Sequence, residues 1–113
     1  MDKMVIVEEE KALIARIKGD INLVVAGWLK DELLEKLSGS EKENLIIDLK
    51  EVALIDSSGI GALISVYKKI EERKGKLFLL NVQPYVKKIL NFARLDRVFS
   101  LSDDEKDILK NLQ

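Results

Sequence analysis

The chain has 113 residues, of which 47% are hydrophobic and 35% charged, which suits one globular domain with a hydrophobic core. Its 19 basic and 20 acidic residues give a formal net charge of -1, so no basic surplus points to nucleic acid. The chain has no cysteine and no histidine, which excludes disulfides, thiolate or histidine metal sites and a Ser-His-Asp triad. No apolar run is long enough for a membrane span or a signal peptide, so we expect a cytoplasmic protein.

The N-terminal region predicts two antiparallel strands. Segments 4–7 and 12–17 are rich in Val, Ile and Leu, and the charged residues 8–11 separate them. This pattern is typical of strands joined by a polar turn. The segment Gly19-Asp20-Ile21-Asn22 then interrupts the apolar pattern. We expect a loop there, with Asn22 as a candidate cap for the helix that follows.

Helical spacing of apolar residues begins at Val24. The predicted buried stripe consists of Val25, Trp28, Leu29, Leu33 and Leu37. The segment 38–40 ends this helix, because Gly39 suits the left-handed position that often follows a last helical turn.

The middle of the chain predicts two buried strands with a helix between them. The nearly continuous apolar runs at 45–49 and 77–80 are typical of strands covered on both faces. After Asp56 the spacing becomes helical, and this helix ends around residues 73–75. Its predicted buried residues are Ile60, Leu63, Ile64, Tyr67 and Ile70.

The C-terminal region predicts two helices and a short strand. Pro84 fits the first turn of a helix, and the predicted buried face consists of Val86, Ile89, Leu90 and Ala93. Segment 95–101, with its valine and phenylalanine, predicts a short edge strand. Ser102 and Glu105 have the spacing of a capping box, which predicts a final helix. We expect its apolar stripe to pack on the sheet; that stripe consists of Ile108, Leu109 and Leu112.

The turn at 56–61, Asp-Ser-Ser-Gly-Ile-Gly, lies between the first buried strand and the helix after it. Asp56, Ser57 and Ser58 are all residue types that cap helices, and free amides at a helix start can accommodate an anion. Gly59 and Gly61 remove side chains from the first turn, which indicates close packing or a close approach. By residue type alone, this turn is a helix cap and nothing more.

Segment 48–63, centred on this Asp-Ser-Ser-Gly-Ile-Gly core, closely resembles the signature of STAS domains. It looks most like the free-standing anti-sigma-factor antagonists of bacteria, and the resemblance extends over nearly the whole chain. The resemblance implies one α/β domain over residues 1–113, with a mixed β-sheet of about five strands flanked by about four helices. The alternation of strands and helices after an initial hairpin predicts the same class of sheet.

The resemblance also implies a phosphorylation switch. In these antagonists, the first serine after the aspartate is phosphorylated by an anti-sigma factor that is also a serine kinase. Carried onto this chain, that residue is Ser57, with Ser58 as second choice and the expected structural cap. The unphosphorylated chain would bind the kinase and release the sigma factor, and a serine phosphatase would reset the cycle. The implied partner-binding residues are Asp56, Ser57, Ser58, Gly59, Ile60, Gly61, Asp20 and Asn22.

Three of the implied partner-binding residues carry an amide or a carboxylate: Asn22, Asp20 and Asp56. The family usually has an aspartate where this chain has Asn22, and an amide accepts hydrogen bonds without bringing a charge. Asp20 lies two residues earlier and is the nearest acid. Asp56 would help to engage the active site of the kinase or to position the serine hydroxyl.

Catalysis and cofactors are not expected. A serine nucleophile could use lysine as its base, but Lys68 and Lys69 lie about three helical turns beyond Ser57. The chain has no Walker A motif and no complete dinucleotide fingerprint. Trp28 and Phe92 are expected to be core or partly buried residues, and the charged run 68–74 a solvated helix face.

Other functions that fit a STAS domain are a nucleotide-binding module, or an interaction subunit of a stress-signalling scaffold or transport complex. Nucleotide titration would test the first of these functions. Recovery of a scaffold or membrane protein in a pull-down would favour the second.

Overall fold

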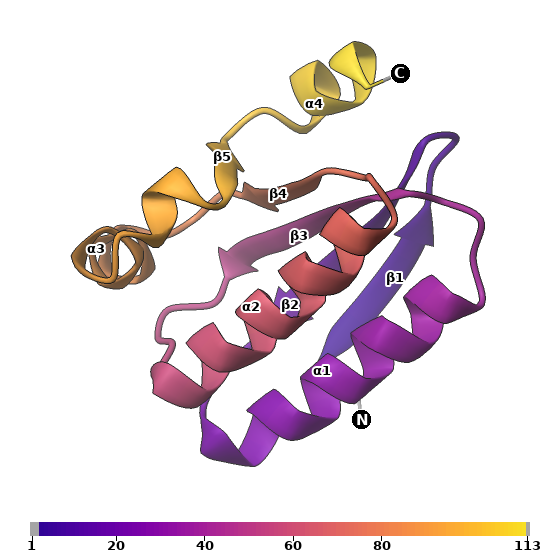
Figure 1. The fold of residues 1–113 in the computed structure, drawn as a ribbon. Helices are drawn as coiled ribbons and strands as arrows, with labels where there is room; N and C mark the ends of the chain where they lie inside the picture. Colours follow the sequence, from indigo (N-terminus) through magenta and orange to yellow (C-terminus); the bar gives the residue numbers. More distant parts are fainter. Residues whose placement is uncertain (1–2, 113) are drawn as a thin grey trace.

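The computed structural model describes residues 3–112 and contains one five-stranded mixed sheet. The strands are β1 (Met4–Glu8), β2 (Ala12–Lys18), β3 (Asn44–Glu51), β4 (Leu77–Leu80) and β5 (Ser100–Ser102). Their order in the sheet is the order of the sequence (Figure 1). β1 pairs with β2 antiparallel, and every later neighbour pairs in parallel. The predicted fold class is therefore confirmed.

Four α-helices and one 3₁₀ helix connect these strands. They are α1 (Leu23–Ser38), α2 (Ser57–Glu72), α3 (Pro84–Phe92), η1 (Leu95–Arg97) and α4 (Glu105–Asn111). α1 and α2 lie side by side over one face of the sheet, with α3 toward the β4–β5 side (Figure 1). Parallel neighbours need crossover connections, and helices supply them here.

The main core lies between the sheet and the α1–α2 layer. Every second residue of β2 and β3 faces this layer, because side chains alternate between the two faces of a strand. The buried side chains from the two strands are Leu13, Ala15, Ile17, Leu45, Ile47 and Leu49. They meet the predicted helical stripes, in which Leu29, Leu33, Leu37, Leu63 and Ile70 are buried.

The opposite face of the sheet has a smaller core, which α4 covers. Ile108 and Leu112 pack against Ile14, Ile46 and Leu80. The prediction that the last helix packs on its own sheet is confirmed.

An ion-pair network anchors the start of α4 to the same face. Arg16 Nη1 lies 2.9 Å from Asp48 Oδ2 and 2.8 Å from Glu105 Oε1. The hydrogen bonds that Arg16 donates to the Glu105 carboxylate contribute most to raising the pKa of Arg16 above its ordinary value. The predicted capping box does not form, because α4 begins at Glu105 itself and not after Ser102. Asp104 is the cap instead, and its Oδ1 accepts from the amide of Asp107 at 3.1 Å.

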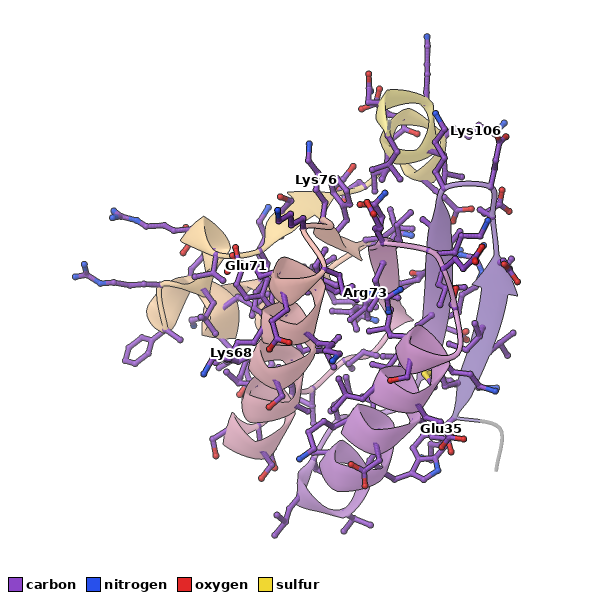
Figure 2. All side chains as sticks on the ribbon, turned by 45° about the vertical axis from the view of Figure 1, so that its right-hand side comes forward. Glu35, Lys68, Glu71, Arg73, Lys76 and Lys106 are labelled. Atoms are coloured by element: carbon purple, nitrogen blue, oxygen red, sulfur yellow. The ribbon has the colours of Figure 1, made fainter. Side chains whose placement is uncertain are left out.

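The end of α1 differs from the prediction. The helix ends at Ser38 with Gly39 as its C-cap, as predicted, but Gly39 has φ -87°, so the expected left-handed conformation is wrong. The Gly39 amide donates to the carbonyl of Glu35, and Arg73, the residue after α2, adds donors from its side chain: it donates to the carbonyl of Leu37 and, at 2.7 and 2.8 Å, to those of Ser40 and Lys42. Figure 2 shows Arg73 turned inward at the end of α2. Within the charged run 68–74, Arg73 is therefore a packing residue rather than part of a solvated face.

We expect Arg73→Met to lower the free energy of unfolding by about 1–3 kcal/mol, because it leaves half-buried carbonyls without donors. Methionine keeps much of the aliphatic bulk, so lost packing contributes little. The control is Lys68→Met, which removes a charge from an exposed position of the same helix and should change stability by less than about 0.5 kcal/mol. Urea denaturation of both variants checks the difference, and equal losses would contradict the assigned role of Arg73.

The region after α3 also departs from the prediction. Segment 95–101 is not one edge strand: it begins as η1, and only Ser100–Ser102 pairs in the sheet. Arg94 has φ 61°, and the amides of Val98 and Phe99 both donate to the carbonyl of Leu95, which turns the chain before it reaches β4. Phe99 is buried and packs edge-on against Tyr67, with ring centroids 5.6 Å apart.

Two predicted packing residues at the end of α3 are exposed. Phe92 is 91% exposed and Ala93 is exposed as well, so both expectations are wrong. Only Val86 and Leu90 of this short helix are buried. Trp28, which was predicted in the buried stripe of α1, is 37% exposed and lies outside the core, so that expectation is wrong as well.

Candidate functional site

The two segments that carry the predicted site residues meet beyond the C-terminal ends of β2 and β3. β2 and β3 are parallel neighbours, so the loops that follow them leave the sheet on the same side. There Ile21 and Ile55 form an isolated parallel bridge. The amide of Ile21 donates to the carbonyl of Leu54 at 3.0 Å, and the amide of Asp56 donates to that of Ile21 at 3.2 Å. The starts of α1 and α2 are therefore held together by backbone hydrogen bonds.

Gly59 packs directly against this junction. A Cβ atom at position 59 would lie 2.6 Å from Ile55 Cγ1 and 2.8 Å from the carbonyl oxygen of Ile21. The close approach predicted for Gly59 is confirmed. For Gly61 it is wrong, since a Cβ there would have no atom within 4 Å outside its own helix. Ile60 is half-buried and packs against the main core.

The cap of α2 is Asp56 and neither of the serines. Asp56 Oδ1 accepts from the amides of Ser58 at 2.9 Å and Gly59 at 3.1 Å. Ser57 and Ser58 are the first two helical residues, so the expected role of Ser58 as the cap is wrong. The amides of Ser58 and Gly59 are not free for an external anion, because both already donate to the carboxylate of Asp56.

Asp56 also reaches the other helix. Its Oδ2 accepts from the amide of Leu23, the first residue of α1, at 3.2 Å. One carboxylate therefore bonds to the N-termini of two helices, where the helix dipoles favour negative charge.

Asn22 caps α1 as predicted. Its Oδ1 accepts from the amides of Val24 at 3.1 Å and Val25 at 3.3 Å. The amide side chain thus makes the hydrogen bonds of a cap without adding a negative charge beside Asp56. Asp20 is exposed and lies in the same loop.

Ser57 is the exposed member of the serine pair. It lies at the start of α2, while Ser58 beside it is half-buried. An exposed hydroxyl at the meeting point of two helix starts is accessible to the active site of another protein.

A shallow hollow of about 230 Å³ lies beside Asp56. Its lining residues are Asp20, Ile21, Asn22, Leu54, Ile55, Asp56 and Tyr85, which include two acids and no base. Large apolar side chains are exposed around it: Leu23 is 75% exposed, Val24 86%, Leu54 48% and Tyr85 50%. We call these four residues the apolar rim.

Sequence reasoning missed the apolar rim, although part of it had a signal. Leu23 and Val24 are adjacent apolar residues at a helix start, off the buried stripe that begins at Val25. Tyr85 had no such signal, because it lies on α3, far in sequence from the other residues of the hollow, and joins them only in the folded chain. Clustered exposed apolar side chains next to polar ones are typical of protein-interaction surfaces.

The part of the chain that the structure describes contains no cluster of three or more acidic side chains that could hold a metal ion. None of the helices there has the length and apolar character needed to cross a membrane. What the site offers is an exposed hydroxyl, two acids and an apolar rim.

Comparison with known proteins connects this chain to a family. The family model described as STAS domain matches residues 3–108. The anti-sigma F factor antagonist of Paenibacillus polymyxa is 26% identical over 101 residues, which cover 89% of this chain and 86% of that protein.

Solved structures share the whole fold. A crystal structure of a Thermotoga maritima protein superposes with a TM-score of 0.91 at 18% identity, over 98% of this chain and 95% of that one. The anti-sigma factor antagonist SpoIIAA in its unphosphorylated form has a TM-score of 0.73 at 16% identity, over 96% and 94% of the two chains. SpoIIAA of Bacillus in the phosphorylated form also has a TM-score of 0.73, at 18% identity over 95% of this chain and 97% of that one.

Proposed function

The chain belongs to the STAS domain family, and from that premise we propose that it is an anti-sigma-factor antagonist controlled by phosphorylation of Ser57. The observation that carries this proposal is the exposed Ser57 hydroxyl at the junction of two helix starts, close to an apolar rim. The Paenibacillus polymyxa relative, named an antagonist of anti-sigma F factor, supports the same function.

In the unphosphorylated state, the apolar rim and Ser57 dock on an anti-sigma factor that is also a serine kinase. Leu23 and Val24 supply apolar contact area from α1, and Tyr85 supplies it from α3. Docking displaces the sigma factor, which is then free to direct transcription. Asp20, Asn22 and the segment 56–61 complete the docking surface.

Phosphorylation ends this binding. The kinase transfers the γ-phosphoryl group of ATP to Ser57 Oγ; the hydroxyl proton is lost and ADP leaves. The product carries about -1.5 to -2 additional charges at the centre of the docking surface. Asp56 and Asp20 are already there, and no base lines the hollow. Burying the phosphate against a partner therefore costs affinity, and a serine phosphatase restores the hydroxyl by hydrolysis.

The fold is expected to persist through this cycle. SpoIIAA structures in the unphosphorylated and phosphorylated forms match this chain with the same TM-score of 0.73, which supports a switch at the surface rather than an unfolding event. The chain itself supplies no catalytic group in this scheme, because the kinase and the phosphatase perform both reactions. We place the cycle in the cytoplasm.

Phosphosite mapping tests the proposal. The purified protein is incubated with ATP and a lysate of its own organism, and wild type, Ser57→Ala and Ser58→Ala are compared by tandem mass spectrometry. We expect one added phosphoryl group that is lost only in Ser57→Ala. Loss only in Ser58→Ala would move the site by one residue. No phosphorylation in a lysate with active kinases of this type would argue for a constitutive scaffold subunit instead.

A further inference from the structure

We infer that Asp56 transmits the phosphorylation state of Ser57 to the first turn of α1. Phosphorylation would then change the structure of the apolar rim as well as the charge of the docking surface. The inference rests on the proposed phosphorylation of Ser57. It assigns Asp56 a positioning role on this chain, separate from any contact with the kinase.

The two carboxylate oxygens of Asp56 accept hydrogen bonds from different helices. Oδ1 holds the amides of Ser58 and Gly59 at the start of α2, and Oδ2 holds the amide of Leu23 at the start of α1. Leu23 and Asp56 are 33 residues apart in sequence. The carboxylate is therefore a side-chain connection between the segment to be phosphorylated and the segment that carries part of the rim.

The first turn of α1 depends on this connection. The first amides of a helix have no partner within the helix, so other groups must satisfy them. Asn22 accepts from the amides of Val24 and Val25 within the same segment, while the Leu23 amide relies on Asp56. Any change at Asp56 therefore acts on Leu23 first.

A phosphate on Ser57 acts on Asp56 in two ways. Its oxygens lie one residue from Asp56 and compete for the amides of Ser58 and Gly59, which attract anions at a helix start. Its charge of about -1.5 to -2 also repels the carboxylate. Competition for the amides and charge repulsion both displace the carboxylate of Asp56 from its present position. Its hydrogen bond with the Leu23 amide is therefore lost.

The consequence is confined to the rim. Leu23 and Val24 are 75% and 86% exposed, whereas Val25 and Ala26 are buried and hold the rest of α1 against the sheet. Loss of the Leu23 hydrogen bond therefore loosens an exposed first turn without moving the helix. Phosphorylation then disorders part of the apolar surface that the partner needs.

The test uses the full chain with phosphoserine installed at position 57 during synthesis, so that no kinase is needed. NMR follows the backbone amides of Leu23 and Val25 in the unmodified and phosphorylated chains. We expect the Leu23 amide resonance to shift and its hydrogen exchange to accelerate about tenfold or more, as for a lost local hydrogen bond. Val25 should change by less than about twofold, because its cap is Asn22.

The matched variant is Asp56→Asn, which has the same shape but only one side-chain oxygen and no charge. It can cap one helix start at a time, so phosphoserine at 57 should add little further change at Leu23. An unchanged Leu23 amide in the phosphorylated wild-type chain, with Ser58 shifted, would overturn the inference. Failure of the proposed function would appear differently, as absence of Ser57 phosphorylation in the lysate experiment.

Discussion

Replacing Ser57 with aspartate is expected to weaken the complex with the anti-sigma-factor kinase by about 100-fold or more, which corresponds to a loss of about 3 kcal/mol. The new carboxylate lies beside Asp56 and close to the apolar rim. On binding this carboxylate must leave water, and no basic residue lines the adjacent hollow to pair with it. Burying an unpaired charge costs several kcal/mol. Isothermal titration against the purified kinase measures the loss.

The same variant should fold as wild type. Position 57 is exposed, and an acid in the first turn of a helix interacts favourably with the helix dipole. The circular-dichroism spectrum and melting temperature should therefore be nearly unchanged. Ser65→Asp is the control, because it puts the same charge on the same helix about 12 Å further along, beyond the screening length in physiological salt. Equal losses of affinity in both variants, or unfolding of Ser57→Asp, would contradict the surface switch.

Gly59→Ala is expected to destabilise the protein by about 2–3 kcal/mol, although alanine normally favours a helix. The added methyl group would lie within 2.8 Å of two isoleucine side chains and of the carbonyl oxygen of Ile21. The side chains of Ile21 and Ile55 are buried, so they have little room to move away. The backbone of the 19–22 loop must shift instead, which also strains the bridge between Ile21 and Ile55.

The control for this prediction lies two residues further along the same helix. Gly61→Ala adds the same methyl group at an exposed position with no neighbour within 4 Å outside the helix, and should stabilise the protein by about 0.5–1 kcal/mol. Denaturant unfolding of both variants gives the two values. A neutral or stabilising Gly59→Ala would mean that the two loops are not packed as closely as described.

The sequence was informative where local pattern decides structure. The apolar runs identified β3 and β4 because a strand buried on both faces needs no polar positions. Asn22 was recognisable as a cap because its own segment supplies both of the amides it accepts from. The cap of α2 was predicted two residues late, at Ser58 instead of Asp56, since adjacent Asp and Ser residues all have cap chemistry. The choice among them follows from the backbone: Asp56 is extended, with φ -106° and ψ -174°, and the helix begins after it.

What the sequence could not show depends on contacts between distant segments. The Arg73 side chain adds donors to the end of α1 because α1 and α2 end near one another, although Arg73 and Leu37 are 36 residues apart in sequence. Tyr85 joins the hollow because α3 packs beside the crossing from β3 to α2. Neither position has a spacing that distinguishes it from an ordinary surface residue.

The parallel pairing of β2 and β3 also links the switch to the lifetime of the protein in a cell. The loops of the docking surface are joined only when these strands are paired, so a partner binds the native chain and not the unfolded one. A partner at 100 times its dissociation constant therefore adds about 2.7 kcal/mol to native stability. In the proposed cycle, phosphorylation would withdraw this stabilisation, and the released chain would open to proteases about 100-fold more often. Turnover of the antagonist is thus coupled to its signalling state through mass action alone.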